Sequence, residues 1–154
     1  MVNKQLLNPK SIAIIGASND STKPGGNMLK NIISGNFGGE LYVVNPKEEK
    51  VQGIKSYAEV NEIPQTDLAI LAIPAKYCPE TVNILAEEKN TKAFIIISAG
   101  FGEAGEQGKK WEQQIVSTVD SVNGCLIGPN CIGVITKNYK GVFTAPVPPF
   151  NPKG

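Results

Sequence analysis

Five short apolar runs recur along the chain, and each ends in a turn of small or polar residues. The first run, at residues 12–15, is rich in β-branched side chains and too short for a helix, which is typical of a buried parallel strand. The predicted strands cover residues 11–16, 41–44, 67–73, 93–97 and 125–127. Their alternation with helical patterns predicts an α/β fold, a Rossmann-like doubly wound parallel sheet of about five strands with helices on both faces.

The segments between the strands supply the expected helices. Apolar positions fall on one helical face in three of them, which predicts helices over residues 25–34, 75–89 and 106–119. A short flap is expected at residues 51–54, followed by a short helix at 56–60 with Ser56 as its N-cap. Residues 134–135 are expected to start a further short strand.

The C-terminal part of the chain has a different composition. Helix and strand periods disappear from residue 139 onward, and residues 145–154 are rich in proline, as in a linker. We therefore expect one domain over residues 1–144 and a linker over residues 145–154 that leads to a domain absent from this sequence. The length of 154 residues fits a single domain of common size.

Composition and charge exclude several classes of protein. With 41% hydrophobic and 19% charged residues, the chain has an ordinary globular composition. A net charge of +1 argues against nucleic acid as a partner, because nucleic-acid binding favours a strongly basic face. No apolar stretch is long enough to span a membrane, and no membrane partner is expected. The first residues lack the apolar core of a signal peptide, so we expect a cytoplasmic protein.

Histidine and cysteine content restricts the chemistry further. The 154 residues contain no histidine, which excludes Ser-His and Cys-His nucleophiles and phosphohistidine chemistry within them. The three cysteines, Cys78, Cys125 and Cys131, show no Cys-x-x-Cys spacing. We therefore expect neither a disulfide framework nor a metal site. Cys78 falls on the inward face of the predicted helix at 75–89, as a packing residue does. No catalytic residue is predicted.

The turn over residues 16–26 has the features of an anion site. It joins a strand to a helix N-terminus, where backbone N–H groups and the helix dipole attract negative charge. Gly16 and Gly26 lack a Cβ, so a phosphate is expected to come close to the backbone there. The turn also carries Lys23 and does not match the Gly-x-Gly-x-x-Gly fingerprint. The alternative is a turn whose glycines only reverse the chain.

The end of the second strand also differs from a dinucleotide site. An NAD site places Asp or Glu there to hold the ribose 2′-hydroxyl. This chain has Asn45, Pro46 and Lys47 instead, and a lysine suits a phosphate on the ribose better than a bare hydroxyl. The alternative is a solvated turn in which the proline stops the strand.

All the unusual turns are expected at one edge of the sheet. Each follows a predicted strand, and the carboxyl ends of parallel strands meet at one edge, where α/β proteins bind ligands. The turns lie at residues 16–26, 45–47, 74–77, 98–103 and 128–131. Their common location favours a ligand that carries phosphate groups.

Five motifs together resemble one family. They are Ile-Ile-Gly-Ala-Ser-Asn at 14–19, Val-Asn-Pro-Lys at 44–47, Ala-Ile-Pro-Ala at 72–75, Ser-Ala-Gly-Phe-Gly-Glu at 98–103 and Gly-Pro-Asn-Cys-Ile-Gly-Val at 128–134. In this order they resemble the CoA-binding domain of NDP-forming acyl-CoA synthetases. The resemblance is greatest to the ADP-forming acetate–CoA ligases and more distant to the succinyl-CoA synthetase α subunit. It covers nearly the whole chain.

The resemblance implies a set of residues that contact coenzyme A. The CoA phosphates would meet the first turn, at Gly16, Ala17, Ser18, Asn19, Lys23, Gly25 and Gly26. The phosphorylated ribose would pair with Lys47 or Lys50, and adenine and diphosphate would lie by Asn45, Pro46, Ile73, Pro74 and Ala75. The pantetheine arm would contact Ser98, Ala99, Gly100 and Phe101, with its thiol end near Asn130 and Cys131. For Cys131 the alternative, a small buried residue that only packs in a tight turn, is as well supported by the sequence as a contact with the thiol end.

The resemblance also implies the function of the longer protein. Members convert acid, CoA and ATP to acyl-CoA, ADP and phosphate through a phosphohistidine. That histidine belongs to a domain absent here, so this chain is expected to bind CoA or acyl-CoA but not to catalyse the reaction alone. Its expected partners are the remaining ligase domains or a nucleotide-binding subunit. Two alternatives stay open, a free-standing CoA-binding regulatory module and an NAD(P)-binding oxidoreductase domain.

Overall fold

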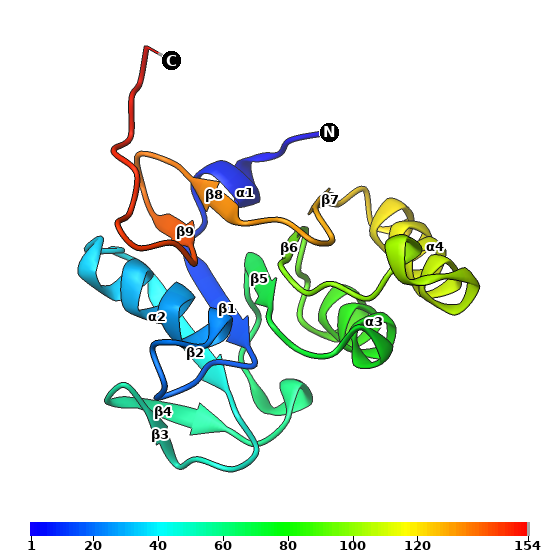
Figure 1. Ribbon diagram of the computed structural model, residues 1–154, viewed down its shortest axis with the longest axis horizontal. Coiled ribbons are helices and arrows are strands. Elements are labelled where there is room, and N and C mark those ends of the chain that lie inside the picture. The colour runs from blue at the N-terminus through cyan, green and yellow to red at the C-terminus, as the bar shows by residue number, and fades with distance from the viewer. Residues whose placement is uncertain (154) are drawn as a thin grey trace.

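A single seven-stranded sheet with helices on both faces forms the centre of the protein (Figure 1). The computed structural model describes residues 1–153. The sheet contains β1 (Ser11–Ile15), β2 (Glu40–Val44), β3 (Lys50–Val51), β4 (Ile54–Tyr57), β5 (Leu68–Leu71), β6 (Ala93–Ile96) and β7 (Cys125–Ile127). Its strand order is β3-β4-β2-β1-β5-β6-β7. All neighbours run parallel except β3 and β4, which are antiparallel.

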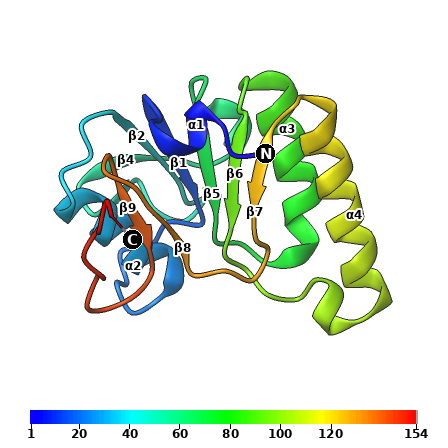
Figure 2. The ribbon, with the colours of Figure 1, turned by 90° about the horizontal axis from the view of Figure 1, so that it is seen from above.

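Helix α1 precedes the first strand, and the other helices lie between strands of the sheet in sequence. The α-helices are α1 (Lys4–Leu7), α2 (Pro24–Ser34), α3 (Cys78–Glu88) and α4 (Glu106–Ser121). Short 3₁₀ helices are η1 (Val60–Glu62), η2 (Ala75–Tyr77) and η3 (Gly102–Ala104). Helix α2 covers one face of the sheet, and α3 and α4 cover the other (Figure 2). In the described part of the chain, no helix combines the length and apolar character needed to cross a bilayer.

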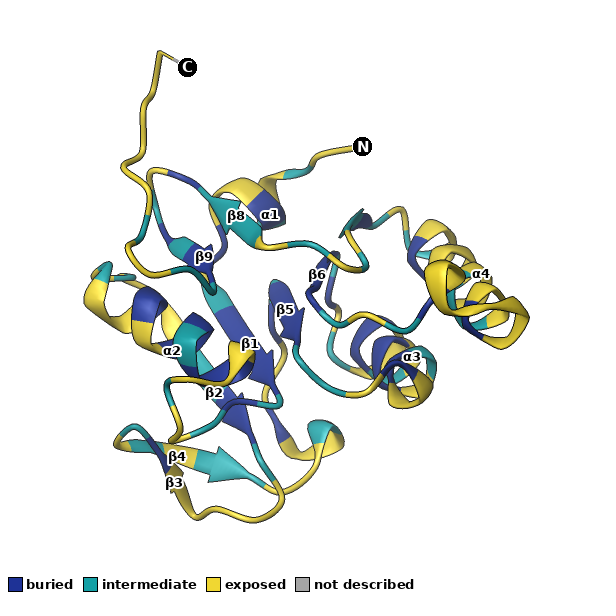
Figure 3. Cartoon of the chain, in the orientation of Figure 1, coloured by how far each residue is buried: buried dark blue, intermediate teal, exposed yellow. Residues whose placement is uncertain are grey.

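Strand β1 is apolar on both sides because it contributes to two cores. Ile12 and Ile14 pack with α2, whereas Ala13 and Ile15 belong to the core beneath α3 and α4. The central strands are accordingly buried along their length (Figure 3). The chain runs from β1 to β2 on one side and continues through β5, β6 and β7 on the other. The order therefore reverses between β1 and β5, and ligands of doubly wound sheets bind at such a point.

The five predicted strands and the doubly wound fold are confirmed. The predicted short helix at residues 56–60 is wrong, because Ser56 lies in β4. Its hydroxyl donates to the carbonyl of Asn45 at 3.0 Å and accepts from the N–H of Asn45 at 3.1 Å. These bonds hold β4 against the end of β2, and the helical turn begins only at Val60.

Residues after β7 form a second, two-stranded sheet beside α2. It pairs β8 (Gly133–Ile135) with β9 (Lys140–Val142), and β9 lies in the region expected to lack secondary structure. Tyr139 is buried, and its hydroxyl donates to the carbonyl of Leu6 at 2.7 Å. Residues 145–153 contain neither helix nor strand. The domain boundary at residue 144 and the role of the following residues as a linker stay predictions.

Candidate functional site

A cavity of about 1070 Å³ opens at the carboxyl ends of β1, β2 and β5, beside the point where the strand order reverses. It brings together predicted site residues from three turns, Gly16, Ala17, Ser18, Lys23, Asn45, Pro46, Lys47, Ile73 and Pro74. The rest of the lining includes Tyr77, from the predicted turn at residues 74–77, and residues that the sequence analysis did not single out, Ala58, Glu59, Val60, Glu80, Thr81 and Ile84. The latter follow β4 or lie in α3, and only the proximity of the two segments in space reveals them.

The turn after β1 is fixed to the end of β2. Gly16 has a φ of +89°, a left-handed conformation that favours glycine, and its N–H donates to the carbonyl of Val44 at 3.0 Å. The amide Nδ2 of Asn45 donates to the carbonyl of Ala17 at 2.9 Å. The side chain of Asn45 thus holds the turn in place, and its Oδ1 accepts from the N–H of Lys47 at 2.8 Å.

Helix α2 begins at this turn, with Lys23 as N-cap and Pro24 in its first turn. The N–H groups of a first helical turn have no acceptor within the helix, and the dipole makes this end positive. No acidic side chain lies in the first turn of α2 to neutralise it. Because Lys23 also lines the cavity, the arrangement suits an anion such as a phosphate.

The glycines of this turn have a packing role in addition to the predicted one, which stays a prediction. A Cβ on Gly25 would overlap the carbonyl of Gly16, and a Cβ on Gly26 would overlap the carbonyl of Asp20. Both residues are buried. Glycine is therefore required for the turn to pack against the helix, rather than only for close approach of a ligand.

The acidic residue of the turn is satisfied within it. The Asp20 carboxylate accepts from the N–H and hydroxyl of Thr22 at 2.9 and 2.6 Å. These bonds lower the pKa of Asp20 below its usual range, and the bond from the Thr22 hydroxyl contributes most. The carboxylate is thus held in the turn by its own hydrogen bonds.

Two lysines were candidates for the ribose phosphate, and the structure separates them. Lys47 lines the cavity and is exposed. Lys50 lies in β3 and is not among the residues that line the cavity, although its carbonyl accepts from Nδ2 of Asn19 at 3.0 Å. Two carboxylates, Glu59 and Glu80, also line the cavity. Lys47 is therefore the better placed of the two candidates.

The turns after β5, β6 and β7 touch one another along the same edge. The Ser98 hydroxyl donates to the carbonyl of Ile73 at 2.6 Å, and the N–H of Asn130 donates to the carbonyl of Ser98 at 3.0 Å. A Cβ on Gly100 would lie 3.3 Å from the Cβ of Ala75. The predicted residues of these turns form one continuous edge, although those after β6 and β7 lie outside the cavity lining.

Phe101 does not contribute its ring to this edge. It is fully buried in the core beneath α3 and α4, so its ring is not accessible to a ligand in this structure, and the contact of Phe101 with the pantetheine arm stays a prediction. The N–H groups of Gly100 and Phe101 both donate to the carboxylate of Glu103, the latter at 3.1 Å. The bond from Gly100 is the main cause that lowers the pKa of Glu103. The free N–H groups of this second Gly-rich turn are thus paired with the carboxylate of Glu103.

Cysteine placement agrees with a packing role. Cys78 is fully buried, as predicted, and burial raises the pKa of its thiol to about 12. Cys131 is half-buried, and its thiol donates to the carbonyl of Ile96 at 3.4 Å. Burial raises the pKa of Cys131 as well. Neither thiol is activated as a nucleophile, because a reactive cysteine needs a lowered pKa.

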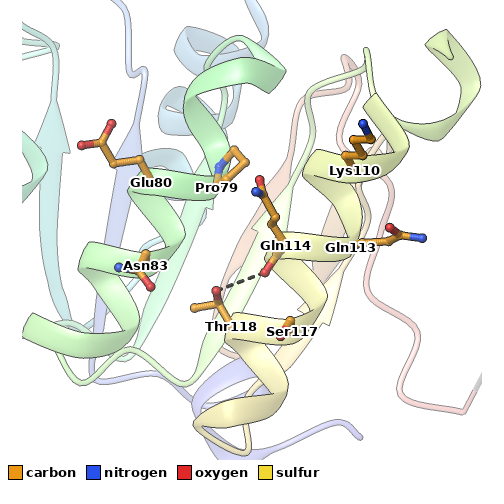
Figure 4. Close-up of a pocket in the computed structure, with 8 residues that line it drawn as sticks. All are labelled: Pro79, Glu80, Asn83, Lys110, Gln113, Gln114, Ser117 and Thr118. Carbon is orange, nitrogen blue, oxygen red and sulfur yellow. Dashed lines mark hydrogen bonds between the residues drawn. The ribbon is translucent and has the colours of Figure 1, made fainter. Parts of the chain in front are cut away.

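A second, more open groove lies between α3 and α4 (Figure 4). Its lining is mostly polar, with Glu80, Asn83, Lys110 and Gln114 among the residues drawn. The hydroxyl of Thr118 donates to the carbonyl of Gln114 at 3.1 Å within the helix. Apart from Glu80, none of its residues lines the cavity at the sheet edge. The groove contains no predicted site residue.

Comparison with known proteins places this fold and site in a family. Residues 10–137 match the family described as "CoA binding domain". The chain is 46% identical over 130 residues to the ADP-forming acetate–CoA ligase II subunit alpha of Pyrococcus furiosus, across 84% of this chain and 28% of that protein. The curated relatives it matches are much longer, since this chain spans 18% to 29% of those compared.

Solved structures agree with this assignment. A crystal structure from Pyrococcus horikoshii superposes with a TM-score of 0.82 at 42% identity, over 91% of this chain and 32% of that one. The acetyl-coenzyme A synthetase 1 of Ca. Korarchaeum cryptofilum, in complex with phosphate and ADP, gives a TM-score of 0.82 at 29% identity, over 91% and 30% of the two chains. The chain therefore belongs to the CoA-binding domain family and is homologous to the α-subunit portion of ADP-forming acyl-CoA synthetases.

Proposed function

We propose that this chain binds coenzyme A in the cavity at the carboxyl edge and supplies the CoA site of an ADP-forming acyl-CoA synthetase. The observation that carries the proposal is the cavity itself, which is lined both by Lys23, the N-cap of α2, and by Lys47. CoA carries a diphosphate and a separate ribose phosphate. The helix N-terminus suits the first and the lysine suits the second.

The proposed orientation follows the edge of the sheet. The diphosphate lies at the turn over residues 16–26, and the 3′-phosphate faces Lys47. Adenine lies against the apolar lining provided by Pro46, Val60 and Ile84. The pantetheine arm leaves past Pro74 and Ala75 along the backbone of residues 98–100. The thiol then ends near the turn at residues 128–131, which contacts Ser98.

Turnover requires groups that these residues do not contain. The 154 residues have no histidine, whereas the family reaction passes through a phosphohistidine. The chain also spans less than a third of each curated relative compared. We therefore propose that the remaining ligase domains or a nucleotide-binding subunit complete the enzyme, with this domain holding the CoA thiol for acyl transfer.

Ligand-dependent melting tests the proposal against the oxidoreductase alternative. A ligand that binds only the folded state at 100 times its dissociation constant stabilises it by about 2.7 kcal/mol. For a domain of this size, CoA should raise the melting temperature by about 5–10 °C. NADH should raise it little, because Asn45 and Lys47 replace the carboxylate that an NAD site uses. A larger shift with NADH than with CoA would overturn the proposed function.

Substitution of Lys47 tests the ribose-phosphate contact. A charge-assisted hydrogen bond is worth about 1.5–3 kcal/mol when shielded and less when exposed. Since Lys47 is exposed, we expect the wild type to prefer CoA over dephospho-CoA by roughly tenfold, which corresponds to 1.4 kcal/mol. Lys47→Ala should remove most of that preference and change the affinity for dephospho-CoA little. Calorimetric titration with both ligands measures the two effects.

Lys50→Ala is the matched control for this experiment. It also removes one lysine charge, but Lys50 lies in β3 and does not line the cavity. We expect Lys50→Ala to retain the preference for CoA. Equal preference in the wild type and both variants would show that neither lysine reads the ribose phosphate.

A further inference from the structure

The β3–β4 hairpin contacts the turn after β1 through one side chain. Gln52 lies at the tip of the hairpin and is half-buried. Its Nε2 donates to the carbonyl of Ser18 at 3.0 Å and to the carbonyl of Gly26 at 2.9 Å. Ser18 lies early in the turn, and Gly26 lies in the first turn of α2. Gln52 therefore joins the two ends of the proposed phosphate-binding segment.

A second pair of bonds runs between the same two segments. The N–H of Gln52 donates to Oδ1 of Asn19 at 2.7 Å, and Nδ2 of Asn19 donates to the carbonyl of Lys50 at 3.0 Å. The side chain of Asn19 is thus committed to the hairpin, although the resemblance assigned it to the CoA phosphates. The bonded residues of the two segments are 26 to 34 positions apart in sequence, so pattern analysis could not pair them.

Glutamine at position 52 is not the residue that the hairpin turn itself prefers, which favours a second role for its side chain. Gln52 and Gly53 have φ values of +49° and +83°, as in a two-residue type I′ turn between β3 and β4. Asparagine is the preferred first residue of such a turn, and longer side chains adopt positive φ less readily. Glutamine has one more methylene than asparagine, and this length lets its amide reach both carbonyls.

We infer that Gln52 is a positioning residue that holds the turn over residues 16–26 in the conformation that binds the CoA diphosphate. The inference rests on the proposed function. A planar peptide fixes its N–H opposite to its C=O, so holding the carbonyl of Ser18 also fixes the next N–H. A turn that is already ordered loses less conformational entropy when a ligand binds. Gln52 therefore strengthens binding without touching the ligand.

Gln52→Asn tests the inference, because it improves the turn sequence and shortens the reach. We expect its thermal stability without ligand to equal or exceed that of the wild type. Its dissociation constant for CoA should rise about tenfold, because a turn that residue 52 no longer holds must be ordered when CoA binds. Adenosine 3′-monophosphate lacks the diphosphate, so its affinity, measured by NMR titration, should change less than about twofold. Gln52→Met, which keeps the volume and removes the donor, should weaken CoA binding by a similar factor and leave the affinity for adenosine 3′-monophosphate nearly unchanged.

Three outcomes are distinguishable. If the wild type does not bind CoA, the proposed function fails and this inference fails with it. If the wild type binds CoA and both variants bind it equally well, only the inference on Gln52 is overturned. Equal losses for CoA and adenosine 3′-monophosphate would also overturn it, since they indicate general disruption of the cavity. Lys55→Ala, in the same hairpin but away from the turn, serves as control and should bind CoA as the wild type does.

Discussion

The Gly26→Ala variant is expected to lower the free energy of unfolding by about 1–3 kcal/mol, the usual cost of overpacking, and to lose CoA affinity at the same time. The added Cβ would overlap the carbonyl of Asp20 and approach the carbonyl of Ser18 at 2.9 Å. Both are backbone atoms, so the turn must move away from α2. Chemical denaturation and CoA titration of the same variant measure the two losses together.

Gly38→Ala is the matched control, since it makes the same change in an exposed loop. A Cβ on Gly38 would have no heavy atom within 4 Å, and we expect a stability change within about 0.5 kcal/mol. A Gly26→Ala variant that keeps wild-type stability while losing CoA affinity would favour the simpler role, in which glycine only gives a phosphate access. Retention of both properties would contradict the packing of this turn described above.

Phe101→Ala is expected to have the largest effect on stability, about 3–5 kcal/mol. The ring is fully buried beside residues of α3 and α4, and its removal leaves a cavity in that core. Phe101→Leu should recover much of the loss because it refills part of the space. Thermal or chemical unfolding of the two variants gives both values.

The control for this prediction is Phe150→Ala, at a residue that is 43% exposed. We expect it to change stability by less than about 0.5 kcal/mol. Should Phe101→Ala leave stability unchanged but weaken CoA binding, the ring would have to face the ligand, and the burial described here would be contradicted.

Strands and glycine-rich turns could be predicted because their signals are local. A run such as residues 12–15 is apolar on both faces, and a parallel strand buried on both faces needs that composition. The β3–β4 hairpin could not be predicted in the same way. Residues 50–57 are mostly polar, and the position of β4 in the sheet depends on bonds from Ser56 to Asn45, at the end of β2. Ser56, with Glu59 three positions later, gives a capping signal that tertiary contacts overrode.

The same limit applies to the site. Lys47 could be identified because it follows a predicted strand at the place where dinucleotide sites have a carboxylate. Gln52 carries no such signal, since its partners, Ser18 and Gly26, lie far away in sequence. The burial of Phe101 could not be predicted because a motif records which residues occur together and not which way a ring points. Its burial depends on the later segment that forms α4.

The carboxylate of Glu103 makes the end of the proposed binding edge near β6 more negative than the end near β1. Near β6, the backbone N–H groups of Gly100 and Phe101 are already paired with this carboxylate, which adds its own negative charge there. Near β1, the start of α2 is positive, and Lys23 stands beside it. A long molecule with an anionic head and an uncharged tail therefore meets a gradient of potential along the edge. We expect this difference in charge to favour binding with the anionic head near β1 and the uncharged tail near β6.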